Sequence, residues 1–299
     1  MEIFSTTLLE WLQRFAIVYS ILTVRYVVIA GLAFLIIWTL LSGRLAHRYI
    51  QPDRRPGGKN ILHEIKYSFI TFFVFGLVGI FIFEASRAGW TRIYRDIDQY
   101  GWVYFAFTVV ATILLHDAYF YWTHRFMHWK KIFKHVHLVH HRSTNPTPWA
   151  AFSFHPIEAV IEAGIVPLVV FLYPIHPGAL AIFLLYMTFL NVLGHLGYEL
   201  FPSGFTRKPA TSWHNTSTHH NMHHKYFECN YGLYFNWWDR LMKTNHPQYH
   251  AQFESRASAQ REPATSSPGL AMTDSGPVAA SDARAVDVTE RRPSNPRVA

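Results

Sequence analysis

Long apolar stretches dominate the pattern of hydrophobic and polar positions along the chain. Four stretches carry almost no charge: residues 15–41, 67–83, 100–115 and 163–198. A membrane-spanning helix needs about 20 apolar residues, and these stretches approach that length once their aromatic flanks are added. The last stretch is long enough to fold back on itself at Pro174 and Pro177. The pattern predicts about four transmembrane helices: three single spans and a hairpin whose short first arm is a candidate re-entrant segment.

Composition favours an all-α integral membrane protein. Hydrophobic residues make up 50% of the 299 residues and charged residues 15%, whereas about a quarter of a soluble domain is charged. The single cysteine excludes a disulfide framework and a cysteine-based metal site. The formal charge is +8, but no stripe dense in lysine and arginine is present, so no nucleic-acid partner is expected.

The loop charges predict the orientation of the spans. Segment 44–66 holds six lysines and arginines, whereas segment 86–99 balances its basic residues with Asp96 and Asp98. Because cytoplasmic loops carry the excess of basic residues, the first loop is expected in the cytoplasm and the second outside it. Segments 116–155 and 199–299, with nearly every histidine, then lie on the cytoplasmic side as a histidine-rich helical cap.

Three regions are expected along the chain. Residues 1–99 form an N-terminal transmembrane region, and residues 100–250 form a catalytic domain that contains the histidine clusters. Residues 251–299 are rich in Ala, Ser, Pro and Arg without an apolar period, which indicates a disordered tail. No cleaved signal peptide is expected, because Glu2 and Glu10 stand where a signal would begin with basic residues.

Histidines are as numerous as acidic residues, at nineteen each, and eight of them fall into three short motifs. One motif reads H-x-x-x-H and two read H-x-x-H-H; a further histidine ends the second arm of the hairpin. Residues three and four apart share a helical face, so each motif is expected to aim its rings in one direction. The nine candidate ligands are His124, His128, His137, His140, His141, His195, His220, His223 and His224.

Nine imidazoles exceed the needs of one metal ion. Two ions with four or five ligands each account for them and leave positions for oxygen. Structural zinc is satisfied by four ligands, so a large all-nitrogen site at a membrane surface favours iron. The alternative is that the histidines are interfacial polar groups on amphipathic helices. Additional or supporting residues are expected among His116, Asp117, His155, Glu199 and His219.

Asp117 precedes His124 by about two helical turns and is a candidate to accept a hydrogen bond from the second nitrogen of a ligand; the alternative is a cap or a partner of Arg125. Glu199 shares a face with His195, although it is equally interpreted as a cap or as the partner of a basic residue. His116 and His155 are candidates for ligands, for partners of ligands, or for rings bonded to the backbone. His219 is interpreted as a loop residue.

Four segments resemble the fatty acid hydroxylase/sterol desaturase superfamily of membrane di-iron oxygenases. They are YWTHRFMH at 121–128, NPTPWAAFSFHPIEA at 145–159, GHLGYELFP at 194–202 and NYGLYFNWWDRLMKT at 230–244. Lys243 departs from the family pattern, which has glycine there. The resemblance covers about residues 110–246, and its Pro-Thr-Pro element is nearest to the sterol desaturase branch.

The resemblance implies a pair of non-haem irons held by the nine histidines. It also implies O2 as oxidant, two electrons from an external donor (a b-type cytochrome, or a ferredoxin with its reductase), and a hydroxylated or desaturated lipid as product. The membrane is then the bacterial inner membrane or the endoplasmic reticulum. Such an apolar substrate needs an apolar entry, for which the candidates are Phe120, Trp122, Trp149, Phe152 and Phe154.

Two other functions compete with the lipid oxygenase. A zinc or iron transporter places ionisable residues in the middle of the membrane, whereas these clusters lie at the ends of spans. A haem-based transmembrane electron carrier pairs histidines across neighbouring spans, at separate depths. The metal bound per chain distinguishes the three: two non-haem irons, transported zinc, or haem with its visible absorption.

Overall fold

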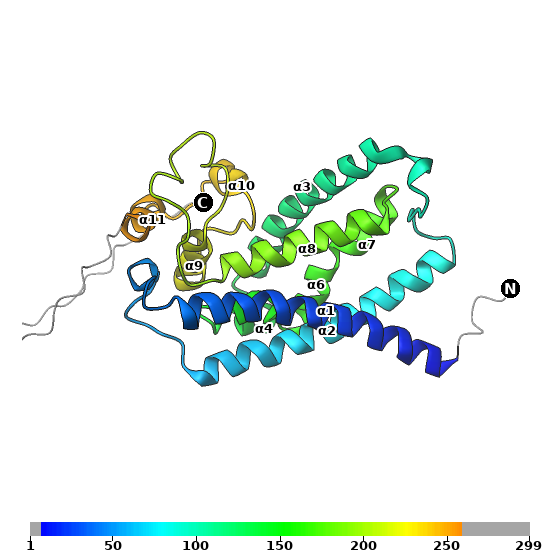
Figure 1. Ribbon diagram of the computed structural model, residues 1–299, viewed down its shortest axis with the longest axis horizontal. Coiled ribbons are helices and arrows are strands. Elements are labelled where there is room, and N and C mark those ends of the chain that lie inside the picture. The colour runs from blue at the N-terminus through cyan, green and yellow to red at the C-terminus, as the bar shows by residue number, and fades with distance from the viewer. Residues whose placement is uncertain (1–6, 259–299) are drawn as a thin grey trace, which may run out of the picture. The chain divides into compact units, whose positions relative to one another are not determined.

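The computed structural model describes residues 7–258, and its regular secondary structure in that range consists of helices, without a β-strand (Figure 1). Four of its helical segments are long and apolar enough to cross a membrane: Leu8–Leu40, Gly58–Arg87, Gly101–Met127 and Pro177–Gly194. They comprise α1 (Leu8–Ala33) with a π-helical continuation (Phe34–Leu40), α2 (Gly58–Arg87), α3 (Gly101–Met127) and α8 (Pro177–Gly194). The all-α, four-span fold is confirmed; the cytoplasmic orientation remains a prediction.

Local chemistry sets where two of these helices begin. Thr7 caps α1: its side chain accepts from the Glu10 backbone N–H, and the Glu10 carboxylate accepts from the Thr7 N–H. This reciprocal pair satisfies two donors that an open helix end leaves unpaired. At α8, the His176 ring accepts from the Gly178 N–H, and Pro177 stands in the first helical position, where no N–H is needed.

The predicted hairpin is present, with its bend at Pro174. Its first arm consists of two short helices, α6 (Pro156–Ala163) and α7 (Ile165–Leu172), joined at Gly164. At about 1.5 Å per residue, an eight-residue helix is much shorter than the hydrocarbon core of a bilayer. Neither helix therefore spans a membrane alone, and the second arm, α8, provides the fourth span.

The short helices of the histidine-rich region gather at one end of the spans (Figure 1). They are α4 (Phe133–Val136), α5 (Leu138–His141), α9 (Ser217–Tyr226), α10 (Trp237–Leu241) and α11 (Tyr249–Ala257). The C-terminal end of α3 and the C-terminal end of α8 reach the same region. The predicted helical cap is thus present, and the spans deliver further histidines to it.

Helix α11 corrects the predicted start of the disordered tail. Residues 251–257 are helical because Tyr249, Phe253 and Ala257 lie four residues apart on one face and are buried against Met222 of α9. Arg48 also donates a hydrogen bond to the Ala257 carbonyl oxygen. The remainder of the predicted tail, residues 259–299, lies outside the described residues.

Aromatic packing holds the first two spans against the segment that follows the second histidine motif. The Tyr26 ring contacts the rings of Phe72 and Phe152, with centroids 5.0 and 5.9 Å apart, and its hydroxyl donates to the Trp149 carbonyl oxygen. The Ser68 hydroxyl donates to the same oxygen. Spans α1 and α2 are therefore fixed against the histidine-bearing part of the chain.

Candidate metal centre

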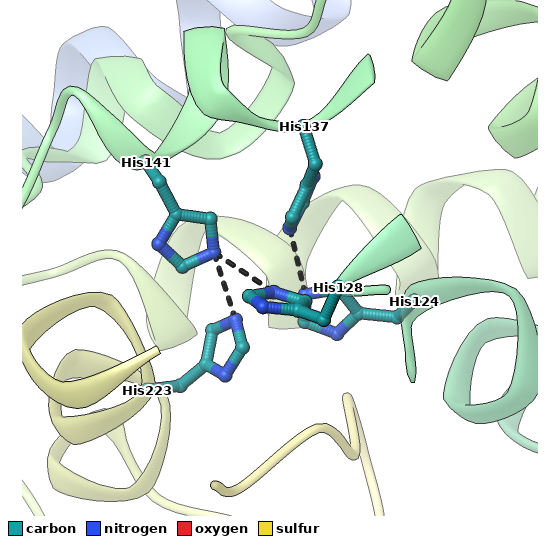
Figure 2. Close-up of side chains that lie close together, drawn as sticks. All are labelled: His124, His128, His137, His141 and His223. Carbon is teal, nitrogen blue, oxygen red and sulfur yellow. Dashed lines mark hydrogen bonds between the residues drawn. The ribbon is translucent and has the colours of Figure 1, made fainter. Parts of the chain in front are cut away.

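The nine candidate histidines converge on two adjacent places, and their ligand nitrogens lie within 4.8 Å of one another in each. The five-histidine group consists of His124, His128, His137, His141 and His223 (Figure 2). The four-histidine group consists of His140, His195, His220 and His224. All of these rings are buried except His128, which is partly exposed. The nine rings singled out from the sequence are the members of the two groups.

Each H-x-x-H-H motif divides its rings between the groups, which corrects the expectation that each motif aims in one direction. His140 belongs to the four-histidine group, whereas His141 belongs to the five-histidine group. In the other motif, His223 belongs to the five-histidine group and His224 to the four-histidine group. The reason is helical geometry: neighbouring residues point about 100° apart around a helix with 3.6 residues per turn.

In the five-histidine group the Nε2 atoms approach one another closely. His124 and His137 are 3.0 Å apart at Nε2. The Nε2 of His141 lies 3.1 Å from that of His128 and 3.0 Å from that of His223 (Figure 2). The rings come from three separate parts of the chain: the end of α3, the α4–α5 segment, and α9.

The four-histidine group is built in the same way around His195. The Nε2 of His195 lies 3.0, 3.2 and 3.3 Å from the Nε2 atoms of His220, His224 and His140. His220 and His224 are 3.2 Å apart at Nε2, one turn along α9. His195 follows the last residue of α8, so a membrane span delivers this ring.

Hydrogen bonds at Nδ1 fix the tautomer of three of the rings. The Nδ1 atoms of His124, His195 and His223 lie 2.7–2.8 Å from the carbonyl oxygens of Tyr231, Asn191 and Cys229. A carbonyl oxygen only accepts, so each Nδ1 carries the proton and each Nε2 presents a lone pair. The second nitrogen of a metal-bound histidine characteristically makes such a contact.

The donor set fits metal ions. Nitrogens at the usual metal–imidazole distance of about 2.0–2.1 Å from one ion lie roughly 3.0–3.4 Å from each other, and the Nε2 contacts in both groups fall between 3.0 and 3.3 Å. Hydrogen bonds alone do not explain these contacts, because Nε2 of His195 has three ring neighbours and its proton on Nδ1. A shared cation would satisfy the converging lone pairs.

Electrostatics keep the rings in the form that binds metal. Burial, followed by the proximity of other histidines, lowers the pKa of His140, His141 and His223 well below the usual histidine value. The same two causes lower the pKa of His220 and His224. Neutral imidazole is the ligand form, so the rings are ready to bind metal at neutral pH.

Glu158 is a supporting residue that the sequence analysis missed. Its Oε1 lies 2.6 Å from Nδ1 of His137, and both side chains are almost completely buried. Burial raises the pKa of Glu158, whereas a cation on the far side of the ring would favour the carboxylate. The available signal was the His-Pro-Ile-Glu sequence at 155–158, which places this carboxyl one turn into α6.

Asp117 and His116 do not have the expected contacts with the ligand rings. Asp117 Oδ1 accepts hydrogen bonds from the backbone N–H groups of Tyr234 and Phe235, at 3.1 Å each. Asp117 therefore holds a backbone loop in place and does not orient a histidine. His116 shares a 2.8 Å hydrogen bond through Nδ1 with the Tyr234 hydroxyl and belongs to neither group.

The other three supporting candidates belong to neither histidine group. The His155 ring accepts from the Ile157 N–H at the start of α6. Glu199 accepts from the backbone N–H and the hydroxyl of Thr218, which fixes the first turn of α9. His219 lies on α9 and not in a loop, and its Nε2 is 3.2 Å from Oδ1 of Asn245.

A mostly apolar cavity of about 260 Å³ lies between α1, α2, α3, α6, α7 and α8. Its wall and that of a small pocket among the histidines share four residues: Phe120, Phe154, Glu162 and Asn191. Of the five aromatic residues expected at an apolar entry, Phe120, Phe152 and Phe154 line this cavity. Trp149 instead packs against Tyr26, and Trp122 packs against Trp238.

Four apolar spans with two buried histidine groups at one end define a multi-pass membrane protein with the ligand chemistry of a metalloprotein. Residues 109–244 match the fatty acid hydroxylase family model. This segment is similar to the fatty acid hydroxylases, and the curated relatives that the chain resembles are sterol desaturases by name. The family and the histidine groups are together consistent with iron binding.

Curated relatives include a Delta(7)-sterol 5(6)-desaturase ERG3B from Gibberella zeae, 31% identical over 72% of this chain and 62% of the relative. Lathosterol oxidase from Rattus norvegicus is 31% identical over 55% of this chain and 53% of the relative. Lathosterol oxidase from Homo sapiens is 27% identical over 60% of each chain. The chain thus spans between half and two thirds of the length of these relatives. No solved structure matches the chain significantly.

Proposed function

We propose that this chain is a membrane-bound, non-haem di-iron oxidoreductase that uses O2 to hydroxylate or desaturate a C–H bond of a lipid. The observation that carries the proposal is the convergence of nine imidazoles into two adjacent groups of five and four. Two groups of this size suit two ions, and an all-nitrogen donor set suits iron. The five-histidine group would hold one iron and the four-histidine group the other.

An unactivated C–H bond resists attack by acids and bases, and a bound iron pair would supply the oxidising power that no side chain provides. The protein contributes ligands, orientation and exclusion of water. Carbonyl oxygens fix the rings of His124, His195 and His223, and Glu158 fixes that of His137. Burial of eight of the nine rings keeps water away from the site.

The apolar cavity supports a lipid as the substrate. It lies among the spans, where a membrane-dissolved molecule resides, and it shares Phe120, Phe154, Glu162 and Asn191 with the histidine pocket. A hydrocarbon in this cavity would lie beside the rings. Because the relatives are named sterol desaturases and lathosterol oxidases, a sterol or a related lipid is the substrate class we propose.

The reaction needs two electrons from outside the chain. We propose a b-type cytochrome, or a ferredoxin with its reductase, as the donor. The basic loop 44–66 lies at the histidine end of the spans, and cytoplasmic loops carry such charge. This favours a site facing the cytoplasm, in a bacterial inner membrane or the endoplasmic reticulum.

The geometry argues against the two competing functions. A haem-based carrier needs pairs of histidines held apart on opposite faces of a haem, whereas the ring nitrogens here lie 3.0–3.3 Å apart. A transporter needs ionisable groups along a path across the membrane, whereas the two groups lie together at one end of the spans. The transporter is also not supported by the relatives.

The test is to purify the full chain, measure its iron and haem, and supply a sterol, O2 and a reducing system. We expect two non-haem irons per chain and a product heavier by one oxygen or lighter by two hydrogens. His224→Ala should abolish the reaction, whereas His135→Ala, which changes an exposed histidine outside both groups, should not. Zinc or haem in place of iron, or full activity of His224→Ala, contradicts the proposal.

A further inference from the structure

The apolar cavity contains a cation that has no partner among the residues that the structure describes. Arg25 lies on α1 and lines the cavity together with aliphatic and aromatic side chains. It forms no hydrogen bond or ion pair with any residue in 7–258, and its Nε is fully buried. Arg14, on the same helix, is different because it is paired with Glu84 at 2.7 Å.

Water at the membrane surface does not provide the missing partner. Arg25 lies 17 residues from Leu8 and 15 residues from Leu40, the ends of its span. Arg25 is thus near the middle of the span, and a hydrocarbon core of about 30 Å leaves roughly 15 Å to either surface, which is farther than an arginine side chain reaches. An ionisable residue at this depth is costly and is usually retained for a function.

Two other polar residues of the cavity, Glu162 and Asn191, also line the histidine pocket, whereas Arg25 and His116 line only the cavity. His116 already shares a hydrogen bond with the Tyr234 hydroxyl. No ion pair joins Arg25 and Glu162 within residues 7–258. The cavity therefore has a cationic place away from the rings and an apolar body that leads to them.

We propose that Arg25 binds the polar end of the lipid substrate and donates hydrogen bonds to an oxygen acceptor there, a hydroxyl or a carboxylate. The hydrocarbon then fills the apolar part of the cavity toward Phe120 and Phe154. A fixed polar end determines which carbon lies beside the histidine pocket, so Arg25 sets the position of reaction along the lipid. This inference rests on the proposed lipid substrate and adds how that lipid is held.

The experiment measures equilibrium binding to the iron-loaded full chain with two pairs of probes. One pair is 5α-cholestan-3β-ol and 5α-cholestane, and the other is stearic acid and octadecane. Hydrogen bonds to a charged group correspond to about a ten- to hundred-fold change in affinity. We expect one oxygen-bearing probe to bind tighter than its oxygen-free counterpart by this factor. The pair that discriminates identifies a hydroxyl or a carboxylate as the recognised group.

Two variants assign the discrimination to Arg25. Arg25→Leu should abolish the preference for the oxygen-bearing probe, whereas Arg25→Lys should retain most of it, because lysine still donates. Both variants should bind as much iron as the unchanged protein, since Arg25 belongs to neither histidine group. If no probe pair discriminates on the unchanged protein, or if Arg25→Leu keeps the preference, the inference is wrong.

The test of Arg25 is separable from the test of the proposed function. Binding needs neither turnover nor an electron donor, so a protein that oxidises a lipid but ignores the probe oxygen contradicts only the role of Arg25. A protein that lacks iron or oxidises nothing contradicts the oxygenase. If Arg25→Leu does not fold, Arg25→Met, which keeps a long unbranched side chain without a donor, takes its place and should abolish the preference.

Discussion

Glu158→Gln should weaken metal binding at one histidine group and leave the other unchanged. Glu158 contacts only His137 among the nine rings, at 2.6 Å, and His137 belongs to the five-histidine group. A glutamine oxygen can still accept from Nδ1, so the ring keeps its orientation while the negative charge is lost. Replacing such partners of metal ligands typically lowers metal affinity by 10- to 100-fold, and we expect about ten-fold for this conservative change.

The assay titrates metal-free protein with ferrous iron in the presence of a competing chelator and in the absence of oxygen. The quantity measured is the iron bound per chain. Two binding steps are expected in the unchanged protein. In Glu158→Gln the step of the five-histidine group should move to a higher iron concentration by about ten-fold. Glu254→Gln is the matched control, because Glu254 accepts hydrogen bonds from Ser203 and Gly204 and contacts no histidine of either group.

A shift of both steps by the same factor would refute the reasoning, because it would show that Glu158 acts on the whole fold. An unchanged titration would also refute it, since the carboxylate would then contribute nothing to His137 as a ligand. Glu158→Ala separates the two parts of the effect. It removes both the charge and the acceptor, and it should weaken the same step further, by about 100-fold.

Three further outcomes are expected. His140→Ala and His141→Ala should each lose about one of two bound irons, and the double variant should lose both, as measured by elemental analysis, because these neighbours serve different groups. Chelation of iron should lower the melting temperature, since a ligand at about 1,000 times its Kd stabilises by about 4 kcal/mol. Gly197→Ala should lower the free energy of unfolding by about 1–3 kcal/mol, measured with denaturant, because Gly197 has φ +74° and a Cβ would lie 2.8 Å from Trp38.

The spans and the membership of the site could be predicted because both are local properties of the sequence. Charge-free stretches such as 67–83 identify helices without knowledge of their neighbours. The spacing within H-x-x-x-H and H-x-x-H-H likewise places rings within reach of one another on any helix. The division of each motif between two groups could not be predicted from spacing alone. It depends on where the remaining histidines of each group lie around the helix that carries the motif.

The parts that were missed are contacts between distant segments. Glu158 follows His137 by 21 residues, and no regular spacing relates a residue in α6 to the end of α4. Helix α11 carries its apolar residues at a spacing of four in a stretch of otherwise polar composition, so its burial depends on the partner surface of Met222. Asp117 had the right spacing for a ligand's partner, but two backbone N–H groups occupy its oxygen.

The division of the motifs explains how a few short helices can form a rigid site at the end of a bundle. The five-histidine group joins α3, the α4–α5 segment and α9; the four-histidine group joins α5, the end of α8 and α9. An ion in either group would cross-link segments that are far apart in the sequence, and α9 would be bound by both. If each motif served a single ion, α9 and the α4–α5 segment would each be bound by one ion instead of by both. Metal binding and the fold of this region are therefore expected to depend on each other.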